Sequence, residues 1–191
     1  MNTQILLGIS LAAFAVTAPL APANGAVTVI GGGMAQECYQ AVEFSRISTT
    51  KALELCDLSL MQENLRRKDR AATLVNRGIL HMRDGRFQRA LDDYERSLDL
   101  QPNLLEAKVN VGAALYGLKR YEEAMVALNE GIGTESLNAR AVGFYNRALC
   151  HERLGDVTAA YLDFRSALEA KPDFELAAEQ LKRFTVLPKE S

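Results

Sequence analysis

The chain has 191 residues, of which 48% are hydrophobic and 24% are charged. This length is typical of one domain, and this composition excludes an intrinsically disordered protein. The formal net charge of −2 at pH 7 argues against a nucleic-acid-binding protein and against a polybasic membrane-surface protein, because both need clustered Lys and Arg.

The N-terminus has the layout of a secretory signal. No charged side chain precedes Glu37, and an apolar run from Ile5 to Ala18 is followed by the sequence PLAPANGA. An apolar core, a proline-containing break and small residues are typical of a segment that signal peptidase removes. The run is shorter than the roughly 20 residues that cross a bilayer. Small residues allow cleavage after Ala23 or, as we prefer, after Gly25.

The predicted export defines the first two segments of the chain. Residues 1–25 are expected to form the signal peptide, and residues 26–36 a flexible leader that contains the glycine-rich sequence IGGGM. The mature protein is accordingly expected to be periplasmic or secreted. Membrane contact is expected only through the cleaved signal segment.

Residues 37–66 are predicted to form a pair of short helices. Cys38 lies on the first of these helices and Cys56 on the second. Because an exported protein meets oxidising conditions, three cysteines suggest one disulfide between Cys38 and Cys56 and a buried thiol at Cys150. Two further buried thiols, in place of the bond, are the alternative.

A repeated unit follows this helix pair, at separations of 34 and then 36 residues. Each unit has two runs of apolar residues at helical spacing, joined by a short turn, and Pro102 and Pro172 end the first and third units because proline disfavours helix. Small residues recur where two antiparallel helices would approach most closely, since larger side chains would push the helices apart. The positions in register are Asn76, Asn110 and Asn146; Gly78, Gly112 and Ala148; Ala90, Ala124 and Ala160; and Tyr94, Leu128 and Phe164.

This pattern resembles the tetratricopeptide repeat family, which has a 34-residue period, a small residue on each helix, an aromatic residue and a terminal proline. The resemblance implies an all-α fold, a right-handed α-α superhelix of three helix hairpins, with residues 37–66 as a degenerate N-terminal repeat. The three repeats would span residues 71–104, 105–140 and 141–174. Residues 175–187 would form a C-terminal capping helix.

The second repeat departs from the family pattern at three positions. Leu128 replaces the aromatic residue, Lys119 stands where a turn glycine is usual, and Gly131 stands where a small helix former is usual. We therefore expect the second repeat to be the loosest of the three.

Members of this family bind peptides or protein segments on the concave surface lined by the first helix of each repeat, and the resemblance implies such a surface here. The three recurring asparagines would form a ladder on it. An amide both donates and accepts, so the ladder could hold the backbone of an extended peptide whatever its side chains. Bonds to neighbouring helices, which would stiffen the stack, are the alternative role. The candidate peptide-binding residues are Asn76, Asn110, Asn146, Ile79, Tyr116 and Tyr145.

Some family members hold the C-terminal carboxylate of a peptide with lysines and an arginine from neighbouring repeats. None of the matching positions in this chain is a lysine, so no carboxylate clamp is expected. These positions are Val75, Ile79, Asn110, Val142 and Asn146.

The sequence contains no recognisable catalytic constellation. His81 and His151 occupy the same place in the first and third units, where packing is the expected role, and neither has the spacing of a metal site. We expect a non-enzymatic scaffold of the cell envelope that binds a protein or peptide and needs no cofactor, metal or nucleic acid. A structural module that self-associates through repeat stacking is the alternative.

Overall fold

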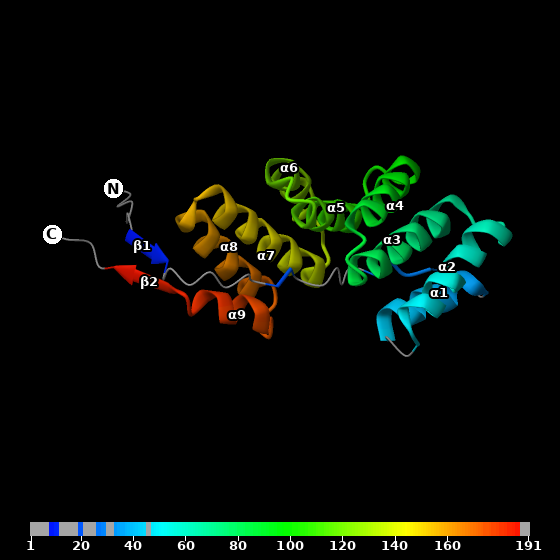
Figure 1. The fold of residues 1–191 in the computed structure, drawn as a ribbon, viewed down its shortest axis with the longest axis horizontal. Helices are drawn as coiled ribbons and strands as arrows, with labels where there is room; N and C mark the ends of the chain where they lie inside the picture. The colour runs from blue at the N-terminus through cyan, green and yellow to red at the C-terminus, as the bar shows by residue number, and fades with distance from the viewer. Residues whose placement is uncertain (1–7, 12–18, 21–25, 30–32, 45–46, 188–191) are drawn as a thin grey trace.

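The computed structural model describes residues 8–11, 19–20, 26–29, 33–44 and 47–187. Within these residues the helices form antiparallel hairpins that stack side by side into an elongated superhelix, as Figure 1 shows. The predicted all-α repeat architecture is confirmed. The helices are α1 (Met34–Phe44), α2 (Thr49–Gln62), α3 (Arg67–Arg83), α4 (Phe87–Leu100), α5 (Leu105–Gly117), α6 (Tyr121–Gly131), α7 (Leu137–Leu154), α8 (Val157–Ala170) and α9 (Glu175–Leu181).

The three repeats are the hairpins α3–α4, α5–α6 and α7–α8. Successive hairpins pack through α4 against α5 and through α6 against α7. One hydrophobic core runs through the whole stack, from Cys38 on α1 to Ala177 on α9. A repeat protein is stabilised in this way because each unit buries its apolar surface against its neighbours.

Each repeat turns at one residue in the left-handed backbone conformation. Gly85 and Gly155 have φ of 68° and 87°, and Lys119 takes the same place in the second repeat with φ of 63°. The next residue, such as Arg120, donates its amide to the carbonyl five positions earlier in all three turns. This is the Schellman arrangement that ends many helices and usually requires glycine. Lys119 therefore carries backbone strain that the two glycines avoid.

Small residues on the first helices make room for large residues on the second helices. A Cβ atom on Gly78 would lie 2.4 Å from Cε1 of Tyr94, and one on Gly112 would lie 2.4 Å from Cγ of Leu128. The sequence pairs these glycines with the alanines of the second helix, but the nearest side chain in the structure is the larger one. The glycine on the first helix and the large residue on the second helix are therefore complementary, because the absent Cβ atom leaves the space that the large side chain fills.

The presence of Gly131 at the end of α6 is likewise explained by a close contact. A Cβ atom there would lie 2.7 Å from the backbone nitrogen of Val109 on α5. Only glycine lets the two backbones approach so closely without displacement. The departure from the family pattern at this position thus brings α6 tightly against α5.

The first and third repeats contain a buried ion pair that the second repeat lacks. The guanidinium of Arg77 bonds the carboxylate of Asp93, and that of Arg147 bonds Asp163 with two bonds of 2.7 Å. His81 and His151 lie near the same carboxylates, with Nε2 at 3.9 Å from Asp93 and at 3.7 Å from Asp163. The equivalent residues of the second repeat are Val111, Leu115 and Ala127.

A glutamate and two cysteines hold the two helices of the N-terminal pair together. Glu63, which follows α2, accepts the backbone amides of Met34 and Ala35 at 2.8 and 3.0 Å, and so caps the start of α1. The hydroxyl of Ser59 donates to the same carboxylate at 2.6 Å. The Sγ atoms of Cys38 and Cys56 lie 2.12 Å apart, with their Cα atoms 5.0 Å apart.

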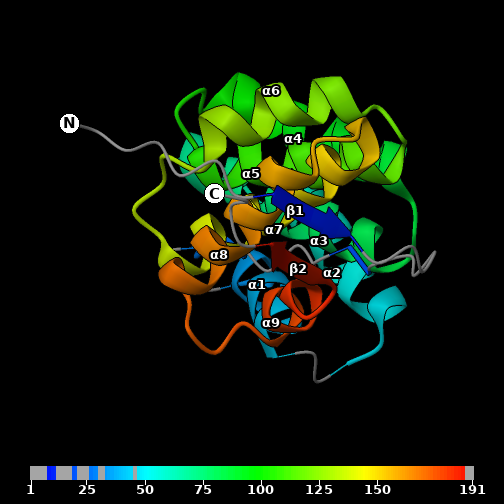
Figure 2. The same ribbon diagram turned by 90° about the vertical axis from the view of Figure 1, so that its left-hand side faces the viewer.

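The C-terminal end differs from the predicted helix over residues 175–187. Helix α9 ends at Leu181, and the strand β2 (Phe184–Leu187) follows it and pairs antiparallel with β1 (Gly8–Leu11), as Figure 1 shows. Figure 2 shows the two strands from this end of the molecule. The ring of Phe184 packs against Tyr161 and Phe164 of α8, at centroid distances of 5.7 and 5.9 Å. These contacts draw the chain out of helix and along the last hairpin.

Strand β1 falls inside the predicted signal segment, and residues 26–29 belong to the predicted leader. In the structure these four residues form neither helix nor strand, and α1 begins three residues before Glu37, at Met34. None of the helices among the described residues is long and apolar enough to cross a membrane.

Candidate functional site

Helices α3, α5 and α7, the first helices of the three repeats, form one face of the stack, which we call the first-helix face. Each contributes one asparagine of the predicted ladder: Asn76 from α3, Asn110 from α5 and Asn146 from α7. All three side chains are at most 1% exposed. Buried amides normally find hydrogen-bond partners, so their partners indicate the role of the ladder.

Asn76 holds the backbone of the chain's own N-terminal segment. Its Oδ1 accepts the amide of Val27 at 3.0 Å, and its Nδ2 donates to the carbonyl of Val27 at 3.0 Å. One side-chain amide thus satisfies both polar groups of one extended residue. This is the binding mode that the sequence predicts for a peptide on the ladder, and it depends on no side chain of the bound segment.

The other two asparagines have buried amide atoms without a partner in the part of the chain that the structure describes. Nδ2 of Asn110, and both Nδ2 and Oδ1 of Asn146, are buried without a hydrogen-bond partner. Leaving a buried polar group unpaired costs about 1–3 kcal/mol. Bonds from these atoms to neighbouring helices, the alternative role of the ladder, are therefore not present. The arrangement leaves donors and an acceptor in line with Asn76.

Tyr145 makes a second contact with the N-terminal segment. Its hydroxyl donates to the carbonyl of Pro19 at 2.7 Å. Its ring is fixed between Phe164 and Phe174, at centroid distances of 5.5 and 5.4 Å. Burial raises the pKa of Tyr145, so the hydroxyl keeps its proton and acts as a donor at neutral pH. The first-helix face therefore contacts the segment at α3 and at α7 (Figure 1).

The two remaining candidates differ in accessibility. Ile79 is fully buried and belongs to the core of the stack. Tyr116 is half-buried, and its hydroxyl accepts a hydrogen bond from Nε of Arg153 at 3.2 Å. Tyr116 is thus available at the edge of the face, whereas Ile79 supports it from beneath.

An apolar cluster lies beside Asn76. Val29 is 4% exposed and packs with Ala35 of α1 and Ala72 of α3. Thr28, between the two valines, is exposed. This alternation is that of an extended strand with one side against the protein. The partly buried residues around the cluster are Val27, Tyr39 and Leu65.

Two groups that could support catalysis, Cys150 and His81, are buried. Cys150 is buried, which raises the pKa of its thiol to about 12, so the reactive thiolate is scarce at neutral pH. Burial lowers the pKa of His81, against the opposing effect of Asp93. No cluster of His, Cys, Asp and Glu that could hold a metal ion occurs among the described residues.

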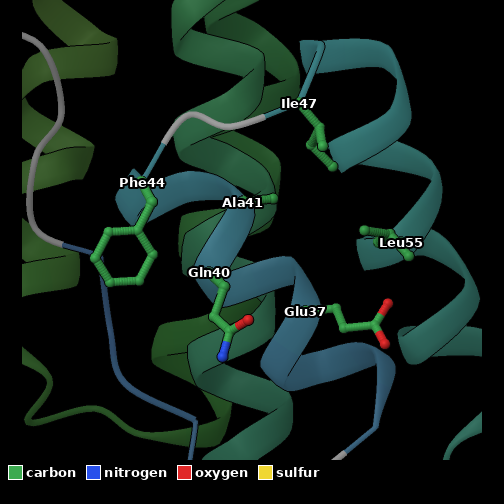
Figure 3. Close-up of a pocket in the computed structure, with 6 residues that line it drawn as sticks. All are labelled: Glu37, Gln40, Ala41, Phe44, Ile47 and Leu55. Carbon is green, nitrogen blue, oxygen red and sulfur yellow. The ribbon is translucent and has the colours of Figure 1, made fainter.

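A surface pocket of about 310 Å³ lies between α1 and α2, and no ladder residue lines it (Figure 3). Phe44 on its rim is 55% exposed. The sequence does not indicate this pocket, because the N-terminal pair departs from the repeat register. Its lining residues are Glu37, Gln40, Ala41, Phe44, Ile47 and Leu55.

A protein of known sequence is similar to part of this chain. The chain is 33% identical over 81 residues to the photosystem I assembly protein Ycf3 of Acaryochloris marina, and this match covers 42% of the chain. The chain spans about half, 47%, of the length of that relative.

Solved structures show the same fold. YrrB, a TPR protein with an unusual peptide-binding site, has a TM-score of 0.60 at 18% identity, with 77% of this chain and 71% of YrrB covered. MamA from Desulfovibrio magneticus RS-1 has a TM-score of 0.58 at 20% identity, with 79% and 93% covered. The second TPR domain of human RPAP3, in complex with the HSP70 peptide SGPTIEEVD, has a TM-score of 0.55 at 22% identity, with 61% and 96% covered.

Family models of the tetratricopeptide repeat match residues 69–133 and residues 141–174. Together these matches cover just over half of the chain, and they coincide with the three hairpins from α3 to α8. The chain therefore belongs to the tetratricopeptide repeat family.

Proposed function

We propose that the protein is a non-enzymatic scaffold of the cell envelope that binds an extended protein segment along the first-helix face. The observation that carries this proposal is the ladder. Asn76 already grips a backbone with both amide atoms, while Asn110 and Asn146 have buried amide groups without partners in the described part of the chain. A segment that runs along the face would supply those partners.

The composition of the face favours recognition of backbone over recognition of charge. Three of the positions that match a carboxylate clamp, Val75, Ile79 and Val142, are buried and apolar. The RPAP3 domain is in complex with an acidic peptide that ends in EEVD. We propose that this chain, without lysine at the matching positions, does not bind such a tail.

A location in the envelope is supported by the signal-like N-terminus and by the cysteines. Cys38 and Cys56 lie at bonding distance, and a disulfide persists in an oxidising compartment. Mass spectrometry of the protein purified without reductant would identify both the first residue and the oxidation state. We expect Ala26 as the first residue and a mass lower by two hydrogens than that of the reduced form. A full-length, reduced chain would contradict export.

Recovery of partners from an envelope fraction tests the binding function. The wild-type protein, as a cross-linked bait, is compared with a variant in which Asn76, Asn110 and Asn146 are all changed to Ala. Asn103→Ala, an exposed asparagine outside the ladder, is the matched control. We expect the triple variant to lose its partner and the control to keep it. Equal recovery by both variants would exclude the ladder from binding.

Self-association is the second candidate function, and exposed apolar residues on the N-terminal helix pair favour it. Met61, Phe44 and Leu58 are 81%, 55% and 39% exposed. Exposed apolar side chains on this terminal helix pair could pack against another copy. Light scattering over a range of protein concentrations tests this function. A mass that stays that of one chain at every concentration excludes it.

A further inference from the structure

The segment Ala26–Val29, which we call the resident segment, occupies the first-helix face as a ligand would. Both backbone polar groups of Val27 are bonded to Asn76. Val29 is buried in the apolar cluster between α1 and α3, whereas Thr28 points to solvent. The face therefore recognises two features of an extended chain. One is the backbone N–H and C=O of a residue, and the other is an apolar side chain two residues later.

The chemistry of this position restricts which segments fit. The cluster around Val29 consists of Ala35 and Ala72, with Tyr39 and Leu65 at its border. A charge at this position would be buried among apolar side chains, which is strongly unfavourable. A β-branched side chain suits it, because it is small and already stiff in an extended backbone.

The resident segment is also tethered close to its site. Only a few residues separate Val29 from Met34, where α1 begins, and Glu63 fixes that start. A short tether gives a local concentration of about 1 mM. For a free peptide with a dissociation constant of about 0.1 mM, competition from the tethered copy weakens apparent binding about tenfold.

We propose that the ligand of the first-helix face is an extended segment with uncharged, β-branched residues two positions apart, and that the resident segment competes with it. This inference rests on the proposed function and specifies its ligand class. The resident segment then sets a threshold: weakly bound segments are excluded, and only a segment that also pairs with Asn110 and Asn146 displaces it.

A peptide with the sequence of residues 24–31, NGAVTVIG, is a suitable probe. Labelled with a fluorophore, it is titrated with the full chain and its anisotropy is measured. Val29→Asp in the full chain should expel the resident segment and tighten binding of the probe at least about tenfold. Thr28→Asp adds the same charge at the adjacent exposed residue and should leave binding as in the wild type.

Further titrations with altered probes and with an altered first-helix face test which features of the probe are recognised. A probe with Asp in place of its second valine should not bind the Val29→Asp chain, and neither should the acidic peptide SGPTIEEVD. Adding Asn76→Ala to the Val29→Asp chain should abolish binding of the unmodified probe. Equal binding of the charged and uncharged probes would overturn the inferred ligand class.

A second variant and a second measurement test the inference even if the Val29→Asp chain does not fold. Val27→Pro removes the amide hydrogen that Oδ1 of Asn76 accepts without adding a charge, although it also changes the side chain and fixes φ. It should likewise tighten binding of the probe. In the wild type, the Val27 amide should exchange with deuterium at least about tenfold more slowly than in Asn76→Ala. Unprotected exchange in the wild type would overturn the inference.

The two proposals can fail separately. If no variant binds the probe although circular dichroism shows intact helices, the inferred ligand class is wrong. Recovery of a partner through the ladder in the envelope experiment would then still support the proposed function. If the ladder variants recover the partner unchanged while the probe binds, the face holds its own segment only.

Discussion

Asn76 and Asn146 stand at equivalent places in the first and third repeats but differ in their bonds. Asn76 makes two hydrogen bonds to Val27, whereas both amide atoms of Asn146 are unpaired among the described residues. In the proposed function, a bound segment would supply the missing partners of Asn146. Stability and binding should therefore respond differently to the same substitution at the two sites.

We expect Asn76→Ala to lower the free energy of unfolding by about 1–3 kcal/mol, because two hydrogen bonds of about 0.5–1.5 kcal/mol are lost. Asn146→Ala should change it by less than about 1 kcal/mol, since removal of an unpaired polar group offsets lost packing. Urea denaturation of both variants measures the difference. Equal losses would indicate that the ladder stiffens the stack.

Lys119 is strained where the other two repeats have glycine. Lys119→Gly should raise the free energy of unfolding by about 1 kcal/mol, because the left-handed conformation costs a non-glycine residue about 1–2 kcal/mol and glycine loses part of this as chain entropy. Gly85→Lys is the matched reverse change, since nothing lies within 4 Å of a Cβ atom there. It should lower stability by a similar amount. Thermal denaturation that shows no gain for Lys119→Gly would refute the assignment of strain.

At the scale of helices, the repeats use two solutions for the same contact. The third repeat joins α7 and α8 through Arg147, His151 and Asp163, whereas the second joins α5 and α6 through apolar side chains. Buried ion pairs contribute little net stability compared with apolar residues of similar volume, but a single unpaired charge is costly. The two solutions should thus be exchangeable only as complete sets.

Arg147→Val alone should lower the free energy of unfolding by about 3 kcal/mol, because Asp163 remains buried and loses its partner. The triple change Arg147→Val, His151→Leu and Asp163→Ala copies the second repeat and should recover most of this loss. Urea denaturation compares the two variants with the wild type. A triple variant as unstable as the single one would show that the third repeat cannot accept the apolar set.

The cap on α1 should make the N-terminal helix pair sensitive to acid. The hydrogen bond from Ser59 lowers the pKa of Glu63, and the amides of Met34 and Ala35 act in the same direction. A carboxylate with a lowered pKa stabilises the fold above its ordinary pKa, and this contribution disappears as the pH falls through the lowered value.

Melting temperatures measured between pH 7 and pH 3 test this cap. The wild type should melt above Glu63→Gln at neutral pH, and the difference should shrink as the pH falls through the lowered pKa and the carboxylate takes up its proton. Glu130→Gln, which affects only an exposed pair with Lys108, should show little difference at any pH. A gap between wild type and Glu63→Gln that is as large at pH 3 as at pH 7 would contradict the cap.

At the scale of the whole molecule, the sequence predicts the repeated part well, for a physical reason. Contacts such as Gly78 with Tyr94 join residues close in the chain and recur at a fixed period, so self-comparison reveals them. The same comparison could have revealed the ion pairs, since Arg77, His81 and Asp93 recur as a set in the third repeat. The set skips the second repeat, so the 34-residue period does not mark it.

The non-repeated part was harder to predict. Pairing of β1 with β2 joins the two ends of the chain, and the bonds between Val27 and Asn76 link residues 49 apart. No period marks either contact, and the N-terminal segment has the composition of a removable signal. The register of the repeats predicts that the ladder lies on the first helices. It does not predict that the segment around Val27 binds there.

The bonds between Val27 and Asn76 give the choice of signal peptidase site a consequence beyond maturation. Cleavage after Gly25 would leave a single residue ahead of Val27, and the new ammonium group would sit at the edge of the anchored peptide unit. Cleavage two residues earlier would leave three residues there. A shift of two residues in the cleavage site would then change how tightly the resident segment binds to the first-helix face. It would do so without altering any residue of the repeats.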